Sequence, residues 1–283
     1  MYRLIFLLFS GVVALCCLLS CGPRASSIVG TTDGYDLDHP RVMPLPTALN
    51  EISGLYFYPK DTSLFAIVDE DGFLYKIFPN HPEKILRWKF AGLGDYEDLE
   101  MVNGVFFILR SDGAIYEVDL EDPLNIKSTV YNAPEKGNEY ESLYFDSTRN
   151  MLVLVCKDCE GDGKKVLSTL AFNIQSKSYV SAPFQIDALH IAGIVGQPSI
   201  KFKPSAAAVN PFSKRLMLVS AVNSLMVVSD LNGDVQQAYP LATKLYKQPE
   251  GIAIGSDRTL YISNEFANEG AANILIIPYK QPR

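Results

Sequence analysis

Short apolar runs alternate with polar turns in a frame that recurs along most of the chain. The clearest copy spans residues 248–265 and starts on a polar residue and a carboxylate. An apolar run (251–254), a turn (255–258) and a second apolar run (259–262) follow, and a polar cluster closes the frame. Short apolar runs that are bounded by turn residues predict β-strands. The frame therefore predicts a pair of strands joined by a turn.

Four further copies of this frame precede the one at 248–265. The copies align on their second polar position, which falls at Ser53, Glu97, Glu141, Ser205 and Glu250. A β-rich unit that recurs every ~40–50 residues is typical of the blades of a β-propeller. We therefore expect an all-β fold, a β-propeller with five blades. Six blades remain the alternative, with the extra blade inside the longer third unit.

The two ends of the chain are expected to share one blade. Residues 274–279 form an apolar run close to the C-terminus, so the last unit lacks a fourth strand. The segment before Glu51 belongs to no unit of its own. A strand from this N-terminal segment would complete the last blade and remove an exposed strand edge. The extra residues of the third unit, around 188–196, predict a short helix or a loop over one face.

Residues 1–20 have the pattern of an export signal. One basic residue, Arg3, precedes an apolar stretch that ends in Leu-Leu-Ser-Cys at residues 18–21. This ending resembles the lipobox of bacterial lipoproteins, which implies cleavage before Cys21 and attachment of lipid to its thiol. A plain membrane-anchoring helix is the alternative. We therefore expect a lipoprotein of the cell envelope, anchored to a membrane by lipid and facing outside the cytoplasm.

Three segments follow from these patterns. Residues 1–20 are expected to be the signal peptide, residues 21–38 a flexible tether, and residues 39–283 the β-propeller domain. The tether is rich in serine, glycine, threonine and aspartate and poor in apolar side chains, which favours a flexible chain. The rest of the chain has a length that β-propellers commonly reach as one undivided domain.

Acidic residues outnumber basic ones in this chain. Its 32 aspartates and glutamates exceed its 25 lysines and arginines, which gives a formal net charge of −7. The sequence contains no cluster of lysines and arginines, so nucleic acid is not expected as a partner. The charge balance fits a cationic ligand, a metal ion or no charged ligand at all.

The repeated polar positions are expected to gather at one end of the central channel. In a propeller the innermost strands start on the face where the following strands end, and residues two apart point to the same side of a strand. The candidate residues for holding a metal or another ligand at this channel mouth are Glu51, Asp69, Glu97, Glu141, Glu250, Asn264 and Glu265. Oxygen donors of this kind suit Ca²⁺, so calcium is the candidate cofactor.

A purely structural role is the alternative for these residues. Crowded carboxylates raise one another's pKa values unless a counter-charge or protonation relieves the repulsion. Arg110 and Lys203 are candidates for such a counter-charge, and they would make a metal ion unnecessary. The repeated glutamates and serines would then bond exposed amides of the neighbouring blade and stabilise each junction.

Other chemical patterns in the sequence are weak. The three histidines share no repeat position, so neither a catalytic triad nor a histidine-based metal site is predicted. Cys156 and Cys159 form a Cys-x-x-Cys pattern outside any thioredoxin-like context. In an oxidising compartment this pattern predicts a local disulfide across a turn, or two unpaired thiols, rather than a redox centre.

Several segments resemble those of the SdiA-regulated family of exported proteins. They are residues 51–55 (Glu-Ile-Ser-Gly-Leu), 94–98 (Gly-Asp-Tyr-Glu-Asp), 140–143 (Tyr-Glu-Ser-Leu), 203–206 (Lys-Pro-Ser-Ala), 245–253 and 260–265. The resemblance covers roughly residues 45–278, and it departs from the family pattern at 206–208, where three alanines stand. It implies a β-propeller fold, and it brings no biochemical activity with it.

Two functions from different classes fit the sequence. The first is a non-catalytic binding module that holds a small-molecule or protein ligand at the channel mouth. The second is a calcium-dependent hydrolase of the lactonase or phosphoesterase type, similar to gluconolactonase and paraoxonase propellers, in which the metal polarises a carbonyl or phosphoryl oxygen. A hydrolase also needs a proton-transfer group beside the metal. No histidine occupies a repeat position, which counts against a histidine-based version, although an aspartate or glutamate could serve. The sequence therefore favours the binding module.

Overall fold

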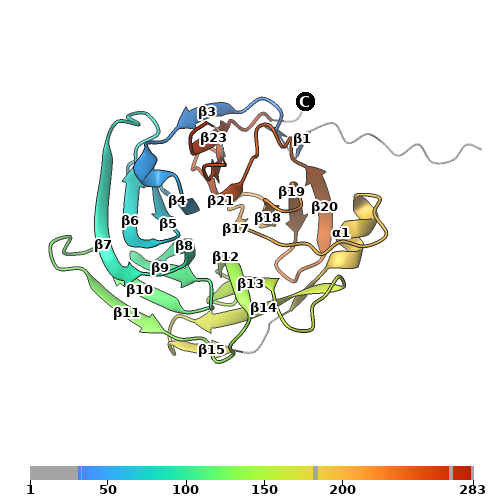
Figure 1. Ribbon diagram of the computed structural model, residues 1–283, viewed down its shortest axis with the longest axis horizontal. Coiled ribbons are helices and arrows are strands. Elements are labelled where there is room, and N and C mark those ends of the chain that lie inside the picture. Colours follow the sequence, from blue (N-terminus) through green and yellow to red (C-terminus); the bar gives the residue numbers. More distant parts are fainter. Residues whose placement is uncertain (1–30, 33, 181–183, 268–269, 282–283) are drawn as a thin grey trace, which may run out of the picture.

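Five antiparallel sheets stand around a common axis as the blades of a propeller (Figure 1). The computed structural model describes residues 31–32, 34–180, 184–267 and 270–281. Within each blade the strands follow the chain from the channel outward, except that the last blade takes its outer strand from the N-terminal segment. The five-bladed β-propeller that the repeats predict is therefore confirmed.

The blades correspond to the five sequence units. Blade 1 contains β4 (Ile52–Tyr58), β5 (Ser63–Val68), β6 (Asp71–Ile77) and β7 (Ile85–Leu93). Blade 2 contains β8 (Tyr96–Val102), β9 (Val105–Arg110), β10 (Ile115–Asp119) and β11 (Lys127–Tyr131). Blade 3 contains β12 (Glu139–Asp146), β13 (Met151–Asp158), β14 (Val166–Asn173), β15 (Ser178–Val180) and β16 (Gln185–Asp187). Blade 4 contains β17 (Ala206–Val209), β18 (Leu216–Ser220), β19 (Leu225–Ser229) and β20 (Val235–Pro240).

Blade 5 closes the ring with strands from both ends of the chain. It contains β21 (Pro249–Ile254), β22 (Leu260–Asn264), β23 (Asn273–Ile277) and β3 (Arg41–Pro44). β3 pairs antiparallel with β23, with Met43 opposite Ile274, and Met43 is buried in the core between blades 5 and 1. The pairing satisfies an edge of β23 that would otherwise be open. The predicted closure by the N-terminal strand is therefore observed.

The folded part begins before residue 39, where the propeller domain was expected to start. β1 (Thr31–Thr32) pairs with β2 (Tyr35–Asp36). Tyr35 is buried, and its hydroxyl donates a hydrogen bond to the Arg258 carbonyl at 2.8 Å. The carbonyl of Leu37, which is also buried, accepts a hydrogen bond from the Tyr246 hydroxyl at 2.8 Å. These contacts place the end of the expected tether within the domain, whereas Cys21 lies outside the described residues.

The extra length of the third unit forms a short strand and a helix. β16 pairs with β14, and η1 (Thr47–Leu49) and α1 (Ala188–Ile194) are the helical segments of the described chain. Asp187 caps α1, because its carboxylate accepts hydrogen bonds from the amides of Leu189 and His190. Ile191 is buried in the core between blades 3 and 4, and α1 lies beside β20 (Figure 1). The insertion therefore covers a junction between two blades, and the extra residues add no blade.

Three of the middle strands, β5, β18 and β19, are covered by neighbouring blades on both faces. Every residue of β5, β18 and β19 is buried. The outermost strands differ, and β11 is exposed along almost all of its length. Strands that are covered on both faces need a continuous apolar sequence, whereas strands with one face in solvent alternate between apolar and polar residues. Apolar packing between adjacent blades therefore holds the ring together.

A layer of small residues closes the channel halfway along. The layer consists of the residue that follows each aligned polar position: Gly54, Asp98, Ser142, Ala206 and Gly251, all of them buried. We call it the waist layer. The Asp98 carboxylate accepts hydrogen bonds from the amides of Leu99 at 2.9 Å and Leu143 at 2.8 Å, so it joins blades 2 and 3. Because all five residues are buried, the waist layer separates the two ends of the channel.

The close approach at the waist layer yields a prediction for Gly54. A Cβ atom at this position would lie 2.5 Å from Asp98 Oδ1 and 2.6 Å from Asp98 Cα. We expect Gly54→Ala to lower the free energy of unfolding by about 1–3 kcal/mol, as overpacked cores do. In a domain of this size that is a fall of roughly 2–4 °C in melting temperature for each kcal/mol. Thermal unfolding followed by circular dichroism measures the change.

Gly92→Ala is the matched control for this substitution. Gly92 lies in the exposed part of β7, and a Cβ atom there would meet nothing within 4 Å. We expect this variant to melt at the wild-type temperature or slightly above it, since alanine restricts the unfolded chain. Equal melting temperatures for wild type and Gly54→Ala would show that the waist layer is not close-packed.

Candidate functional site

The aligned polar positions are β-bulges at one end of the channel. The strand register shifts between Ile52 and Leu55, between Tyr96 and Asp98, between Tyr140 and Ser142, and between Pro249 and Gly251. Each shift falls on an aligned position, namely Ser53, Glu97, Glu141 and Glu250. A bulge leaves its extra residue without a partner in the ladder and turns its side chain aside. The repeat therefore places three glutamates at the same end of the channel, which we call the acidic mouth.

Lys157 is the cation of the acidic mouth. It lies near the end of β13, and its Nζ forms ion pairs with Glu141 and, at 3.0 Å, with Glu139. Its charge also lowers the pKa values of Glu97 and Glu250, so the ammonium lies close to both carboxyls. One lysine therefore faces glutamates from blades 2, 3 and 5.

The pKa values of Glu97 and Glu250 lie well above those of ordinary glutamates. Burial raises the pKa of Glu97 to about 9, and the neighbouring Asp95 carboxylate adds to the increase. Burial likewise raises the pKa of Glu250 to about 8, with a contribution from Glu265. Among the described residues, neither carboxyl has an ion-pair partner within 4 Å. The acidic mouth therefore contains more carboxyls than its lysine can neutralise, and protons make up the difference.

Asp69, Glu51 and Glu265 form the side of the acidic mouth between blades 5 and 1. Burial and the Glu51 carboxylate raise the pKa of Asp69, and a hydrogen bond between these two carboxyls contributes. Burial and Glu51 also raise the pKa of Glu265, whose carboxylate accepts a hydrogen bond from Gln248 Nε2. The structure thus brings six of the seven predicted residues to one end of the channel.

Asn264, the seventh predicted residue, does not face the acidic mouth. It is almost fully buried, and its Nδ2 donates hydrogen bonds to the Leu245 carbonyl and to Asn273 Oδ1, both at 3.0 Å. Asn264 therefore stabilises blade 5 from within. Adjacent residues of a strand point to opposite sides, so only Glu265 of this pair reaches the channel.

The two basic residues expected as counter-charges bond elsewhere. The Arg110 guanidinium pairs with Asp112 at 2.7 Å and donates to the Tyr116 hydroxyl at 2.8 Å. Lys203 Nζ lies 2.8 Å from Asp158 Oδ2. Neither lowers the pKa values of the buried carboxyls as Lys157 does. The expected neutralisation is therefore present, but a different residue supplies it.

The acidic mouth does not have the geometry of a calcium site. Calcium takes six to eight oxygen ligands. In the described part of the chain, the one group of three acidic, cysteine or histidine side chains with ligand atoms within 4.8 Å is Cys156, Cys159 and Asp162. Cys156 and Cys159 are joined by a disulfide with their Cα atoms 6.0 Å apart, so their sulfurs are not thiolates. Lys157 lies where the carboxylates of the acidic mouth converge, and the residues present do not fit a calcium ion.

A polar cavity opens beside Lys157. It has a volume of about 320 Å³. Its walls include two glutamates and three lysines, together with Ser205 and Gln248: Glu141, Glu250, Lys157, Lys203 and Lys247. Blades 3, 4 and 5 therefore all contribute to it. A space of this size holds a small polar ligand, within the range of known ligand sites.

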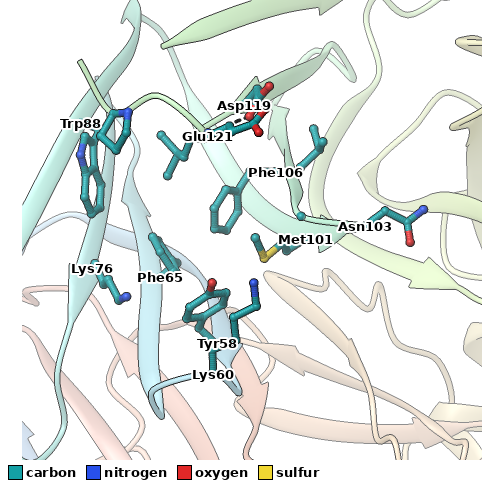
Figure 2. A pocket seen from close by; sticks show the side chains of 14 residues that line it. Tyr58, Lys60, Phe65, Lys76, Trp88, Met101, Asn103, Phe106, Asp119 and Glu121 are labelled. Atoms are coloured by element: carbon teal, nitrogen blue, oxygen red, sulfur yellow. Dashed lines mark hydrogen bonds between the residues drawn. The ribbon is translucent and has the colours of Figure 1, made fainter. Parts of the chain in front are cut away.

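A second cavity, of about 550 Å³, lies between blades 1 and 2 (Figure 2). Its aromatic side chains pack on one another, with 4.6 Å between the ring centres of Phe65 and Phe106. The Lys76 ammonium covers the Tyr58 ring at 4.8 Å and bonds to Asp61. The aromatic faces therefore contact neighbours within the fold, which agrees with inter-blade packing rather than a sugar-binding platform.

Two acidic residues of the inner strands have no acidic counterpart in the other repeat units, so the repeat pattern did not identify them. Asp98 and Glu100 stand in β8 at positions where the other units have small, aromatic or apolar residues. Burial raises the pKa of Glu100 to about 7. The sequence could have pointed to them in one way, because both are charged residues within an otherwise apolar inner strand. A charged group that is buried needs a partner, so such residues are candidates for a special role.

Comparisons with known proteins agree with the fold. A family model described as SdiA-regulated matches residues 30–268. The crystal structure of Myxococcus xanthus glutaminyl cyclase is similar with a TM-score of 0.60 and 15% identity, over 86% of this chain and 96% of that chain. The crystal structure of a glucose dehydrogenase has a TM-score of 0.55 and 11% sequence identity, over 84% of this chain and 99% of that chain. The structure of a luciferin-regenerating enzyme has a TM-score of 0.51 and 9% sequence identity, over 85% of this chain and 95% of that chain.

At these identities the similar structures show the fold and not an activity. A search of curated proteins found no match to the chain. The family match covers most of the chain, and of the blade strands only β23 lies beyond it.

The raised pKa values predict that stability falls as the pH rises. A carboxyl with a folded-state pKa above its unfolded value stabilises the fold at low pH, and this contribution is lost as the pH rises to the folded pKa. For Glu97 that window runs from about 4.3 in the unfolded chain to about 9. Wild type is expected to lose up to about 1.4 kcal/mol per pH unit from this group. Glu97→Gln should therefore melt progressively higher than wild type as the pH increases from 5 to 9.

Glu83→Gln is the control, because Glu83 lies in an outer turn with a side-chain exposure of 75%. It should follow the wild-type melting curve at every pH. A second arm adds calcium or a chelator at neutral pH, and we expect no shift in melting temperature from either. A calcium-dependent rise that wild type shows and Glu97→Gln lacks would demonstrate a metal site at the acidic mouth.

Proposed function

This chain belongs to the SdiA-regulated family, and we propose that it is a non-catalytic binding module whose acidic mouth takes a small ligand with a positively charged amine. The observation that carries this proposal is a polar cavity of about 320 Å³ whose wall includes Glu141 and Glu250. Burial raises the pKa of Glu250 to about 8 and that of the neighbouring Glu97 to about 9. Lys157, Lys203 and Lys247 also line the cavity, but among the described residues neither Glu97 nor Glu250 has an ion-pair partner, and a cationic ligand supplies one.

The binding step exchanges a proton for the ligand. When an ammonium group approaches Glu97 or Glu250, its charge favours the ionised carboxylate, and the proton leaves to solvent. A charge-assisted hydrogen bond then replaces a neutral one, and such bonds are about twice as strong. The remaining wall includes Gln248, whose side-chain carbonyl is a neutral acceptor for the rest of the ligand. Affinity and pH are therefore coupled at the acidic mouth.

A hydrolase has less support from the same geometry. The carboxylates of the acidic mouth do not converge as metal ligands. His39 and His81 are exposed, with side-chain exposures of 81% and 70%, and His190 lies in α1. None of the three histidines lines the cavity beside Lys157. A histidine general base is therefore not in place, and a carboxylate such as Glu250 would have to take that role.

Calorimetric titration with putrescine tests the proposal. Because binding requires ionised carboxyls, we expect the affinity to rise from pH 6 to pH 9 and to level off above the pKa of Glu97. The heat should vary with the ionisation enthalpy of the buffer, since a proton is released. Glu250→Gln should weaken binding at pH 9 by roughly 10-fold or more, which corresponds to the loss of one charged hydrogen bond.

Two controls accompany this titration. Propionate has a similar size and the opposite charge, and it should not bind. Glu83→Gln, which removes an exposed carboxylate far from the channel, should bind putrescine as wild type does. Affinity that is independent of pH, or equal binding of propionate, would contradict a cation site at the acidic mouth.

We further propose that lipid on Cys21 anchors the mature protein to a membrane of the cell envelope, outside the cytoplasm. The support is the Leu-Leu-Ser-Cys sequence at residues 18–21 after an apolar stretch. Among the described residues, no helix is long and apolar enough to cross a membrane. Each methylene of an attached chain that enters the bilayer contributes about 0.8 kcal/mol, so lipid chains suffice as an anchor.

Cys21→Ser is expected to move the protein out of the membrane fraction and to abolish labelling by an alkyne-tagged fatty acid. Cys17→Ser is the matched control, because Cys17 lies in the same apolar stretch and would leave with the signal peptide. It should keep both the membrane association and the label. Unchanged fractionation of Cys21→Ser would refute anchoring at this residue.

A further inference from the structure

The channel has a second opening on the far side of the waist layer. A cavity of about 580 Å³ lies there, and the inner strands of all five blades line it. The residues at the equivalent position of four of these strands are Tyr56, Glu100, Ala208 and Ala253. The two alanines are small, and they leave the space that larger side chains would fill. The far cavity therefore results from the repeat itself.

The walls of the far cavity are mostly apolar. Leu55, Phe57, Phe145, Val209, Ile252 and Ile254 are among its lining residues. Met101 belongs to the wall as well, and it also lines the cavity between blades 1 and 2 (Figure 2). Ser147, Thr148, Lys214 and Ser256 add polar groups. A largely apolar cavity of this volume with few polar groups is typical of a small-molecule site.

Two polar groups meet in the inner part of this cavity. Glu100 is part of its wall and retains some exposure toward it. The charge of Glu100 raises the pKa of Tyr56 in addition to the effect of burial, so the Tyr56 hydroxyl lies near the carboxyl. Tyr56 is also part of the cavity wall. A carboxyl and a hydroxyl therefore stand beside the same apolar space.

We propose that the far cavity binds a small apolar molecule that carries a single ammonium group, with the apolar body against the aliphatic and aromatic wall and the ammonium on Glu100 and Tyr56. The amides of Phe145 and Met101 face the Glu100 carboxyl, and they favour its ionised form once a cation is present. The rings of Tyr56, Phe57 and Phe145 add negative faces that attract a cation. An anion would meet the Glu100 carboxylate in a poorly solvated space.

This site is independent of the acidic mouth. The waist layer lies between the two, and all of its residues are buried. The acidic mouth has polar walls, so a longer apolar tail on an amine gains nothing there. In the far cavity each added methylene is removed from water. Dependence on chain length therefore distinguishes the two sites.

The test compares octylamine, octanol and octanoate by calorimetry, each below its micellar concentration, with butylamine and putrescine as short probes. We expect octylamine to bind at least 10-fold more tightly than octanoate, with octanol between them. Each methylene removed between octylamine and butylamine should weaken binding about three- to four-fold. Glu100→Gln should bring octylamine and octanoate close to equal affinity, and it should leave octanol unchanged.

Two further variants keep the outcome clear. Ser256→Trp places a bulky ring at an exposed position of the cavity rim and should weaken all three eight-carbon probes without unfolding the protein. Glu250→Gln should reduce putrescine binding and leave the chain-length dependence intact. Failure of octylamine to bind, a preference for octanoate, or an unchanged preference in Glu100→Gln would overturn the proposal. Loss of putrescine binding alone would count against the acidic mouth and not against the far cavity.

Discussion

The structure depends on one buried layer in which a single carboxylate fills the space that four small residues leave. Asp98 lies at the waist layer, where Gly54 and Gly251 let neighbouring strands approach. Burying a carboxylate is costly, and two backbone amides from different blades offset much of that cost. One acidic side chain therefore fixes how close the inner strands stand, and this spacing sets the width of the channel at both ends.

From the waist layer outward, the two ends of the channel diverge in chemistry along the same five strands. At one end the bulges turn glutamates inward, and Lys157 partly neutralises them. At the other end the strands are apolar and enclose Glu100. Both ends hold carboxyls whose pKa values are raised by burial. The propeller thus keeps carboxyls with raised pKa values in reach of small ligands, which a more open ring with solvated walls would not do.

The repeat was readable in the sequence, and the details that depend on strand register were not. Blade count, ring closure and six of the seven mouth residues follow from the spacing of polar and apolar positions. Lys157 and Asp158 are adjacent at the end of β13, and the spacing does not choose between them, because the bulge at Glu141 shifts the pairing and decides which side chain turns inward. Asp98 and Glu100 occur in one unit only, so an alignment of repeats does not select them. Asn264 was misplaced because its neighbour Glu265, and not Asn264 itself, points into the channel.

The pairing of β3 with β23 has a consequence for the order of events in folding. Arg41 leaves the ribosome long before Ile276, its partner in the ladder, so the ring is open until almost the whole chain exists. Contacts between residues so far apart in sequence form slowly, since a long loop must close first. Until then both strands expose edges that invite association with other chains. If the chain is exported unfolded, the ring can close only after nearly complete translocation. Truncated chains that lack β23 would leave the edge of β3 unpaired, and this edge would distinguish them from complete chains.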